Sequence, residues 1–205
     1  MTTDQSRPGL RDRKKRQTRA ALSAAALRLV AERGLDQVTV EEISEAADVS
    51  ARTFFNYFPS KDEALLGDQP TDREVLAARV VAAPAEVSAF DALRLAFDDV
   101  VGAIEADREV WLLRLQVIAA NPSLLPRLIS GNAETEQVIV AAVAARLGLD
   151  PGHGHPTLVT TVAGAVFRTA LMQWVEQPDT TTLRELTAQA FAAVAAGLPD
   201  PYAST

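Results

Sequence analysis

The segment SARTFFNY, residues 50–57, carries side chains of the kinds that recognise the edges of base pairs. An arginine can donate two hydrogen bonds to guanine, an asparagine can pair with adenine, and a threonine can contact a thymine methyl group or a phosphate. A tyrosine, or a lysine placed just beyond it, can bind the phosphate backbone. This composition predicts contacts with double-stranded DNA at Arg52, Thr53, Asn56, Tyr57 and Lys61.

The phenylalanines of the same segment predict how those polar groups are held. If Ser50 caps a short helix, apolar residues share one side of it by three- and four-residue spacing, and polar residues share the other. Pro59 then ends the helix, because the residue before a proline avoids the α conformation. The residues expected in the core are Ala51, Phe54, Phe55 and Phe58. A polar helix face that only meets solvent would look the same in isolation, so the neighbouring elements matter.

The flanking residues predict two more short helices. Thr39 followed by Glu42 matches a capping box, which begins a helix of about two turns. Ser50 caps the next helix, and Ser60 with Glu63 begins a third. Two short helices joined by a turn of about three residues are typical of a helix-turn-helix.

A basic segment precedes this motif. Residues 1–33 carry nine Lys or Arg against three Asp or Glu, although the whole chain has a net charge of −7. A helix is expected over residues 11–33, and its first turns bear charge without an apolar stripe. Because the helix-turn-helix itself is rich in acids, attraction to phosphates must come mainly from this arm; a solvated basic tail is the alternative. The phosphate contacts predicted here are Lys15, Arg16 and Arg19.

Residues 18–65, TRAALSAAALRLVAERGLDQVTVEEISEAADVSARTFFNYFPSKDEAL, resemble the TetR family of bacterial transcriptional regulators. The resemblance implies an all-helical homodimer with an N-terminal DNA-binding domain and a C-terminal ligand-sensing domain. Asp48 stands in the turn where many members have Gly. The DNA contacts that the resemblance implies are Thr39, Arg52, Thr53, Tyr57 and Lys61.

We therefore expect an all-α protein: an N-terminal three-helix helix-turn-helix domain, then a C-terminal helical bundle for ligand binding and dimerisation. The expected divisions are a disordered tail over 1–10, the DNA-binding domain over 11–67, the sensing domain over 68–198 and a loose tail over 199–205. Helices of the second domain are expected at 88–106, 108–120, 124–147, 157–176 and 182–196.

The sensing domain suggests an effector. The stretches LLGDQPTDREVLAARVVAAPAEVSAFDALRLAF and ADREVWLLRLQVIAANPSLLPRLI resemble the mycofactocin-system regulators, and this resemblance implies acyl-CoA or another acyl-type ligand. A set of aromatic and Met residues is also what an ordinary core contains, and either arginine of the set could instead pair with Glu105 or Glu109. The candidate ligand-binding residues are Trp111, Arg114, Phe167, Arg168 and Met172.

The last two helices are candidates for pairing with a second copy. Small residues such as Gly164 would allow close approach, although both helices could equally close the core of a single chain. Two copies about one DNA turn apart would read a palindrome, which one short helix cannot do alone.

Other site chemistries have little support in the sequence. His153 and His155 lie in a loop-like stretch, DPGHGHP, without a third metal ligand at a suitable spacing, so we expect a linker rather than a metal site. There is no nucleophile–base pairing and no phosphate-binding glycine loop, which predicts neither a cofactor nor an enzyme. With no cysteine and a charged N-terminus lacking an apolar signal core, the chain is expected in the cytoplasm, on the nucleoid.

Taken together, these features predict a homodimeric repressor that binds a palindromic operator and is released by a small, largely apolar effector. The alternative is an all-α adaptor whose basic arm grips RNA or a surface. A membrane is not expected as a partner, because residues 11–19 lack an apolar face and the apolar run 158–175 contains Arg168.

Overall fold

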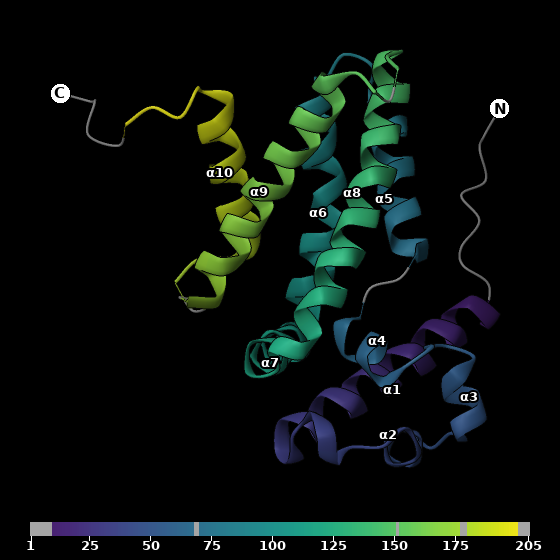
Figure 1. The fold of residues 1–205 in the computed structure, drawn as a ribbon. Helices are drawn as coiled ribbons and strands as arrows, with labels where there is room; N and C mark the ends of the chain where they lie inside the picture. The colour runs from purple at the N-terminus through teal and green to yellow at the C-terminus, as the bar shows by residue number, and fades with distance from the viewer. Residues whose placement is uncertain (1–9, 68–69, 151, 177–179, 201–205) are drawn as a thin grey trace. The chain divides into compact units, whose positions relative to one another are not determined.

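The computed structural model describes residues 10–67, 70–150, 152–176 and 180–200, and their regular elements are helices (Figure 1). This confirms the all-α class. The expected tails, 1–10 and 199–205, fall largely outside the described residues. The helices of the N-terminal part are α1 (Leu10–Arg33), the short 3-10 turn η1 (Leu35–Gln37), α2 (Val40–Ala46), α3 (Ala51–Phe55) and α4 (Lys61–Leu66). The helices that follow are α5 (Pro70–Ala82), α6 (Ala89–Ala106), α7 (Arg108–Ala120), the 3-10 turn η2 (Pro122–Leu124), α8 (Leu125–Leu147), α9 (Gly154–Glu176) and α10 (Leu183–Ala195).

The chain divides into two compact units. The first unit contains residues up to 68 together with 109–128, and the second contains 69–108 and the residues from 129 onward. This division falls after residue 68, where the sequence-based boundary is after residue 67, and residues 109–128 pack with the N-terminal helices. The physical reason is a shared core, because Val117 of α7 and Leu124 of η2 are buried in the same hydrophobic cluster as α1.

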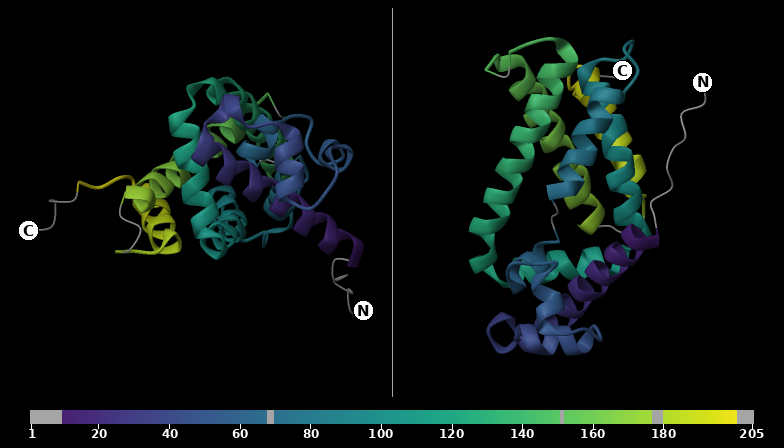
Figure 2. Two further views of the ribbon diagram at one scale, coloured as in Figure 1. Left: turned by 90° about the horizontal axis from the view of Figure 1, so that it is seen from below. Right: turned by 90° about the vertical axis from the view of Figure 1, so that its right-hand side faces the viewer.

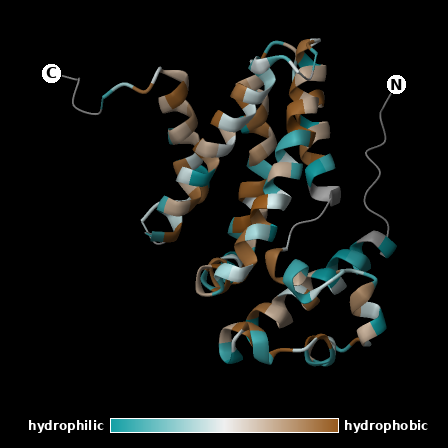
Figure 3. Ribbon diagram, in the orientation of Figure 1, coloured by the Kyte–Doolittle hydropathy of each residue, from teal (hydrophilic) through white to brown (hydrophobic). Residues whose placement is uncertain are grey.

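The first unit is built around one face of α1. Its apolar residues are buried from Leu22 onward, whereas the first turns of the helix are hydrophilic (Figure 3). Gly34 ends the helix with a positive φ of 87°, and its N–H bonds to the carbonyl of Val30 at 2.8 Å. The buried members of this face are Leu22, Ala25, Ala26, Leu27 and Val30.

The helix-turn-helix forms at the caps expected from the sequence. Thr39 and Glu42 make a capping box at the start of α2, and the Ser50 side chain accepts the N–H of Thr53 at the start of α3. Asp48 occupies the turn with a φ of 54°, a left-handed conformation that Asp tolerates better than most residues. The structure therefore explains how this chain forms the turn without glycine.

The second unit is a bundle of α5, α6, α9, α10 and most of α8. Its apolar centre contains four phenylalanines, and α10 lies beside α9 in every view (Figures 1 and 2). Phe97 stacks on Phe167 with ring centroids 4.8 Å apart and planes 1° apart. Phe191 joins them at 6.2 Å from Phe97 and 4.8 Å from Phe90.

One arginine fixes the turn between α5 and α6. The guanidinium of Arg146, in the last turn of α8, donates to the carbonyls of Val80, Ala83 and Val87 at 3.4, 2.7 and 2.9 Å, and also to that of Pro84. Because these carbonyls belong to a helix end and the turn after it, they lack intrahelical donors. Arg146 supplies donors to all four.

Helix α9 is long and apolar enough to cross a membrane by length and composition. In the structure one face of α9 is buried in the second unit. The buried residues of this face include Ala163, Val166, Ala170 and Trp174. A core helix of this kind passes the same composition test. The helix begins at Gly154, earlier than expected, and the His153 ring nitrogen Nδ1 accepts the N–H of His155 at 3.1 Å.

Candidate nucleic-acid interface

The exposed face of α3 combines three kinds of contact group. Arg52 and Asn56 are exposed, as expected for residues that read base pairs, and Phe55, three residues after Arg52, is exposed beside Arg52 on the same side. Phe54 and Phe58 are 0% and 1% exposed and anchor the helix in the core of the first unit. A helix this short cannot be stable alone, so its orientation depends on these two anchors.

Phe55 corrects one sequence-based expectation. It was placed in the core with its neighbours, but 56% of its surface is exposed. Successive residues of a helix point about 100° apart, so Phe55 turns away from the core that Phe54 fills. The two rings meet edge to face, with their centroids 5.5 Å apart. The spacing of three residues between Arg52 and Phe55 was the signal that could have revealed this exposure.

Thr53 and Tyr57 are half-buried at the edges of this face. The Thr53 hydroxyl lies 2.9 Å from that of Ser50, where it supports the helix cap. Tyr57 packs against the hydrophobic core of the first unit. Both remain beside the exposed face, with part of each side chain accessible.

Arg19 belongs to the first unit itself. Its guanidinium nitrogen Nη1 donates to the Tyr57 carbonyl at 2.5 Å, and its Cζ lies 3.9 Å from the centre of the Phe58 ring. The sequence placed this arginine with the phosphate-binding arm. The structure uses it to connect α1 to the residues that follow α3, because the end of a helix leaves carbonyls without intrahelical donors.

Lys61 also has internal partners. Its ammonium donates to the carbonyls of Leu35 and Val38, at 2.6 and 3.0 Å. These contacts join the start of α4 to the segment that leads into α2. An ammonium has three N–H donors, so one remains beyond these two bonds for a phosphate.

Thr39 is exposed at the start of α2, and both its hydroxyl and its N–H are engaged in the capping box with Glu42. Its hydroxyl lies 3.1 Å from Glu42 Oε2, and the same oxygen accepts the Thr39 N–H at 2.9 Å. The backbone N–H of Thr39 is the main cause that holds the pKa of Glu42 below its ordinary value, helped by the Thr39 hydroxyl and by Arg33. A phosphate approaching Thr39 would therefore meet a carboxylate nearby.

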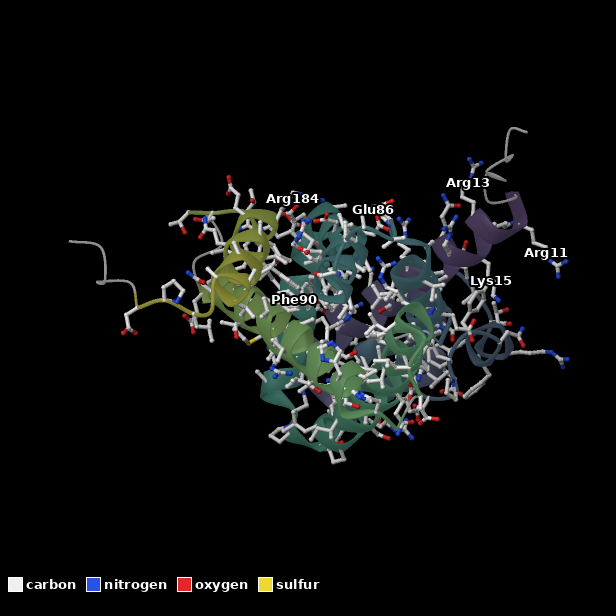
Figure 4. The ribbon with its side chains drawn as sticks, turned by 90° about the horizontal axis from the view of Figure 1, so that it is seen from above. Arg11, Arg13, Lys15, Glu86, Phe90 and Arg184 are labelled. Atoms are coloured by element: carbon white, nitrogen blue, oxygen red, sulfur yellow. The ribbon has the colours of Figure 1, made fainter. Side chains whose placement is uncertain are left out.

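The basic arm is the first part of α1. Lys15 and Arg16 are exposed, and Arg11, Arg13 and Lys15 project outward from these turns (Figure 4). By contrast, a hollow of about 450 Å³ next to the start of α3 is lined by acids. The acids among its lining residues are Glu41, Glu45 and Asp48.

The five residues expected to bind an effector fall in two different units. Trp111 and Arg114 lie on α7 in the first unit, where Arg114 is buried and donates to a carbonyl of α4 and a hydroxyl of α1. Phe167 lies in the second unit, in its aromatic centre. Arg168 and Met172 are on the exposed face of α9, with Met172 44% exposed.

The second unit has a polar hollow that sequence reasoning missed. It has a volume of about 450 Å³ at the ends of α6, α9 and α10. The Arg108 guanidinium carbon lies 5.7 Å from the centre of the Trp174 ring at this hollow. The residues that line this hollow come from segments far apart in the chain, so no sequence pattern could connect them. They include Glu105, Arg108, Trp174, Thr182 and Glu185.

Comparisons with known proteins agree with this architecture. A family model described as bacterial regulatory proteins, tetR family, matches residues 22–66, and a model of the MftR C-terminal domain matches residues 87–199. The transcriptional regulator TcmR of Streptomyces glaucescens is 32% identical over 180 residues, which are 84% of this chain and 80% of that protein. A Mycobacterium tuberculosis protein named as the mycofactocin biosynthesis regulator MftR is 29% identical over 177 residues, covering 86% and 89%.

Solved structures show the same fold. The FadR repressor of Thermus thermophilus, crystallised with lauroyl-CoA, is similar with a TM-score of 0.55 and 19% identity, over 91% of this chain and 98% of that one. The matched relatives are transcriptional regulators and not enzymes, and they favour DNA regulation over the alternative of an RNA- or surface-binding adaptor. With the model of the MftR C-terminal domain matched over more than half of the chain, this protein belongs to the TetR family of bacterial transcriptional regulators and is a DNA-binding regulator of the repressor type.

Proposed function

We propose that the protein is a homodimeric repressor that reads a palindromic operator with α3 and leaves it when an acyl-type effector binds. The observation that carries the proposal is the exposed face of α3, where Arg52, Phe55 and Asn56 are presented by a helix anchored through two buried phenylalanines. An arginine and an asparagine on one short helix match the donor and acceptor pattern of the major groove.

Each residue of this face has a role that fits its chemistry. Arg52 would donate to guanine O6 and N7, and Asn56 would pair with adenine. Phe55 would contact a thymine methyl group, since an exposed ring offers dispersion contact and no hydrogen bond. Thr53 would contribute its methyl group and Tyr57 its hydroxyl, the latter to a phosphate.

The phosphate contacts come from two places. The main attraction is assigned to Lys15 and Arg16 of the arm, with smaller contributions from Lys61 and Thr39. Arg19 acts indirectly by fixing the end of α3. Because the acids Glu41, Glu45 and Asp48 lie near α3, the salt dependence of binding would depend mostly on the arm.

We assign dimerisation to α9 and α10. Apolar side chains are exposed on the outer face of α9, including Leu158 at 61% and Met172 at 44%. Four of the seven exposed residues of α10 are alanines, beside Arg184, Glu185 and Gln189, and small side chains allow two helices to approach closely. The exposed alanines are Ala188, Ala192, Ala193 and Ala195.

We place the acyl chain of the effector at the aromatic centre of the second unit. Phe90, Phe97, Phe167 and Phe191 form this centre, and apolar walls of this type bind apolar ligands. The match to the MftR C-terminal domain supports the class of sensor, while the FadR structure supports the fold alone. An effector releases DNA only if it binds the non-binding dimer geometry more tightly. Binding to the chromosome would keep the protein in the cytoplasm, on the nucleoid.

The experiment begins with selection of a binding site from random duplexes of about 30 bp, long enough for two half-sites one helical turn apart. Affinity for the enriched duplex is then measured by fluorescence anisotropy for wild type, Arg52→Ala and Lys15→Met. We expect Arg52→Ala to lose preference for the enriched sequence. We expect Lys15→Met to weaken all duplexes and to lower the salt slope by about 0.9 for each subunit, or about 1.8 for the dimer. Lauroyl-CoA, compared with free coenzyme A, tests the effector class. If both variants keep wild-type affinity and preference, the assignment of this face and arm is wrong.

A further inference from the structure

Arg114 is a buried cation at the centre of the first unit. It lies on α7 and is 8% exposed. Its Nε donates to the Leu65 carbonyl at 3.1 Å, its Nη2 donates to the Ser23 hydroxyl at 3.1 Å, and its Cζ lies 4.7 Å from the centre of the Trp111 ring. One side chain of α7 therefore holds both α1 and α4.

The contact with α4 occurs where that helix needs donors. Helix α4 has only six residues and ends at Gly67 in the left-handed conformation, so its last carbonyls lack intrahelical partners. The Ser23 hydroxyl donates to the Ala64 carbonyl at 2.6 Å, and Arg114 donates to the next carbonyl. A positive charge is also favoured at this end by the helix dipole.

The fit at this end of α4 is tight. A Cβ atom placed on Gly67 would lie 2.7 Å from Cζ and from Nη2 of Arg114, closer than real Cβ contacts. Gly67 also has a φ of 75°, which glycine adopts without strain. Because Gly67 has no side chain, the Arg114 guanidinium can pack against the end of α4.

Helices α1 and α4 in turn fix α3. Arg19 of α1 binds the Tyr57 carbonyl beyond the end of α3, and Lys61 of α4 binds two carbonyls of the segment before α2. The same two helices share their hydrophobic core with Phe54 and Phe58 of the recognition segment. A change in the angle between α1 and α4 therefore changes the direction in which α3 presents its exposed face.

We propose that Arg114 is a positioning residue for DNA recognition, and that the DNA-binding unit of this protein is discontinuous, with α7 as its additional helix. This inference rests on the proposed function of α3. Arg114 does not touch DNA; it fixes the α1–α4 geometry on which base reading depends. Phosphate binding by the exposed arm does not require that geometry, so loss of Arg114 should reduce specificity more than general affinity.

The test uses the full chain with Arg114→Met and Arg114→Lys, and Arg108→Met as the matched control. Arg108 is an arginine of the same helix, and its guanidinium lies over the ring of Trp174 in the second unit. Affinity is measured by anisotropy for the duplex enriched by wild type and for a scrambled duplex of equal length, at low temperature, with helicity followed by circular dichroism.

We expect Arg114→Met to keep wild-type helicity and lose roughly tenfold or more of its affinity for the enriched duplex, while affinity for the scrambled duplex changes by less than about twofold. Arg114→Lys should recover part of the loss, because it keeps a charged donor near the α4 carbonyls. Arg108→Met should retain the wild-type ratio of the two affinities. A general loss of stability would lower helicity and both affinities together.

A wild-type ratio in folded Arg114→Met would overturn the inference. If Arg114→Met does not fold, Ser23→Ala takes its place: it removes one bond of the guanidinium together with the Ser23 bond to the Ala64 carbonyl, and it should lower the ratio several-fold. An unchanged ratio would again refute the proposal. If wild type enriches no duplex at all, the proposed function fails and the inference fails with it. If wild type enriches one and the variants keep its specificity, only the role of Arg114 fails.

Discussion

Replacement of Lys61 by methionine separates the two roles that this lysine can have. Methionine keeps the aliphatic stem and removes the ammonium, which donates to the carbonyls of Leu35 and Val38 at 2.6 and 3.0 Å. Hydrogen bonds from charged groups contribute about 1.5–3 kcal/mol each. The site is part-buried, so water can replace some of each bond, and we expect a net loss of about 2 kcal/mol.

The assay is thermal unfolding of the full chain followed by helicity, together with DNA affinity across a salt series. For a chain of this length, 1 kcal/mol corresponds to a shift of about 2–4 °C, so we expect the Tm of Lys61→Met to fall by about 4–8 °C. If the remaining N–H also binds a phosphate, the salt slope falls by about 0.9 for each subunit, or about 1.8 for the dimer.

Lys15→Met is the control for this experiment. Lys15 is an exposed lysine of the arm, so its loss should leave the Tm unchanged and lower only the salt slope. An unchanged Tm in Lys61→Met would refute the inference that its two carbonyl contacts stabilise the first unit. With an unchanged Tm and a lower salt slope, Lys61 would be a phosphate contact, as the sequence alone suggested.

The remaining predictions concern the caps, the second unit and base reading. In the folded state the pKa of Glu42 lies below its ordinary value of 4.5. The ionised carboxylate therefore stabilises the fold fully above pH 4.5, and this stabilisation is lost as the pH falls through the lowered pKa. Glu42→Gln should flatten the decline of Tm measured from about pH 5 to pH 3. Arg146→Met should cost about 2–3 kcal/mol in denaturant unfolding, because the carbonyls of Val80, Ala83 and Val87 lose the Arg146 donor and that of Pro84 keeps only the Val87 N–H. Exposed Arg168→Met should change the free energy of unfolding by less than about 0.5 kcal/mol. Phe55→Ala should abolish the affinity difference between duplexes with thymine and with deoxyuridine at one operator position, and an undiminished difference would exclude Phe55 as the reader of that methyl group.

Local signals predicted most of the helices of the fold. Capping residues are short-range features, and the expected helix starts at Thr39, Ser50 and Ser60 correspond to the observed caps of α2, α3 and α4. The expected helix 108–120 matches α7. The Gly and Pro residues before residue 157 are typical of a loop, so the sequence places the start of the helix expected at 157–176 late. In the structure α9 already begins at Gly154, and the His153 ring accepts the N–H of His155 in its first turn.

Partners far apart in the chain were not predictable from the sequence. Arg19 and Lys61 are both basic residues near the helix-turn-helix, and nothing in their spacing shows that each has a carbonyl partner more than 20 positions away. The sequence predicts a ligand or an acid as the partner of Arg114, and in the structure its guanidinium donates to the Leu65 carbonyl and the Ser23 hydroxyl. Such roles depend on packing between segments that are far apart in the sequence, which periodicity does not describe.

Phe55 shows a different limit. A five-residue helix is too short for its apolar stripe to have a defined width, so a phenylalanine adjacent to Phe54 can be assigned to either side. The sequence identified the recognition segment and its polar contacts as candidates. Only the three-residue spacing of Phe55 from Arg52 indicated that the exposed face also contains an aromatic ring.

Chemical protection of guanine N7 on the enriched duplex tests the central claim most directly. Reading of base edges by α3 predicts guanines protected in the major groove of two symmetric half-sites, about 10 bp apart or a multiple of that, with protection lost in Arg52→Ala. Tight binding of wild type with every guanine still reactive, or protection that persists in Arg52→Ala, would contradict the assignment of α3 as the helix that reads DNA.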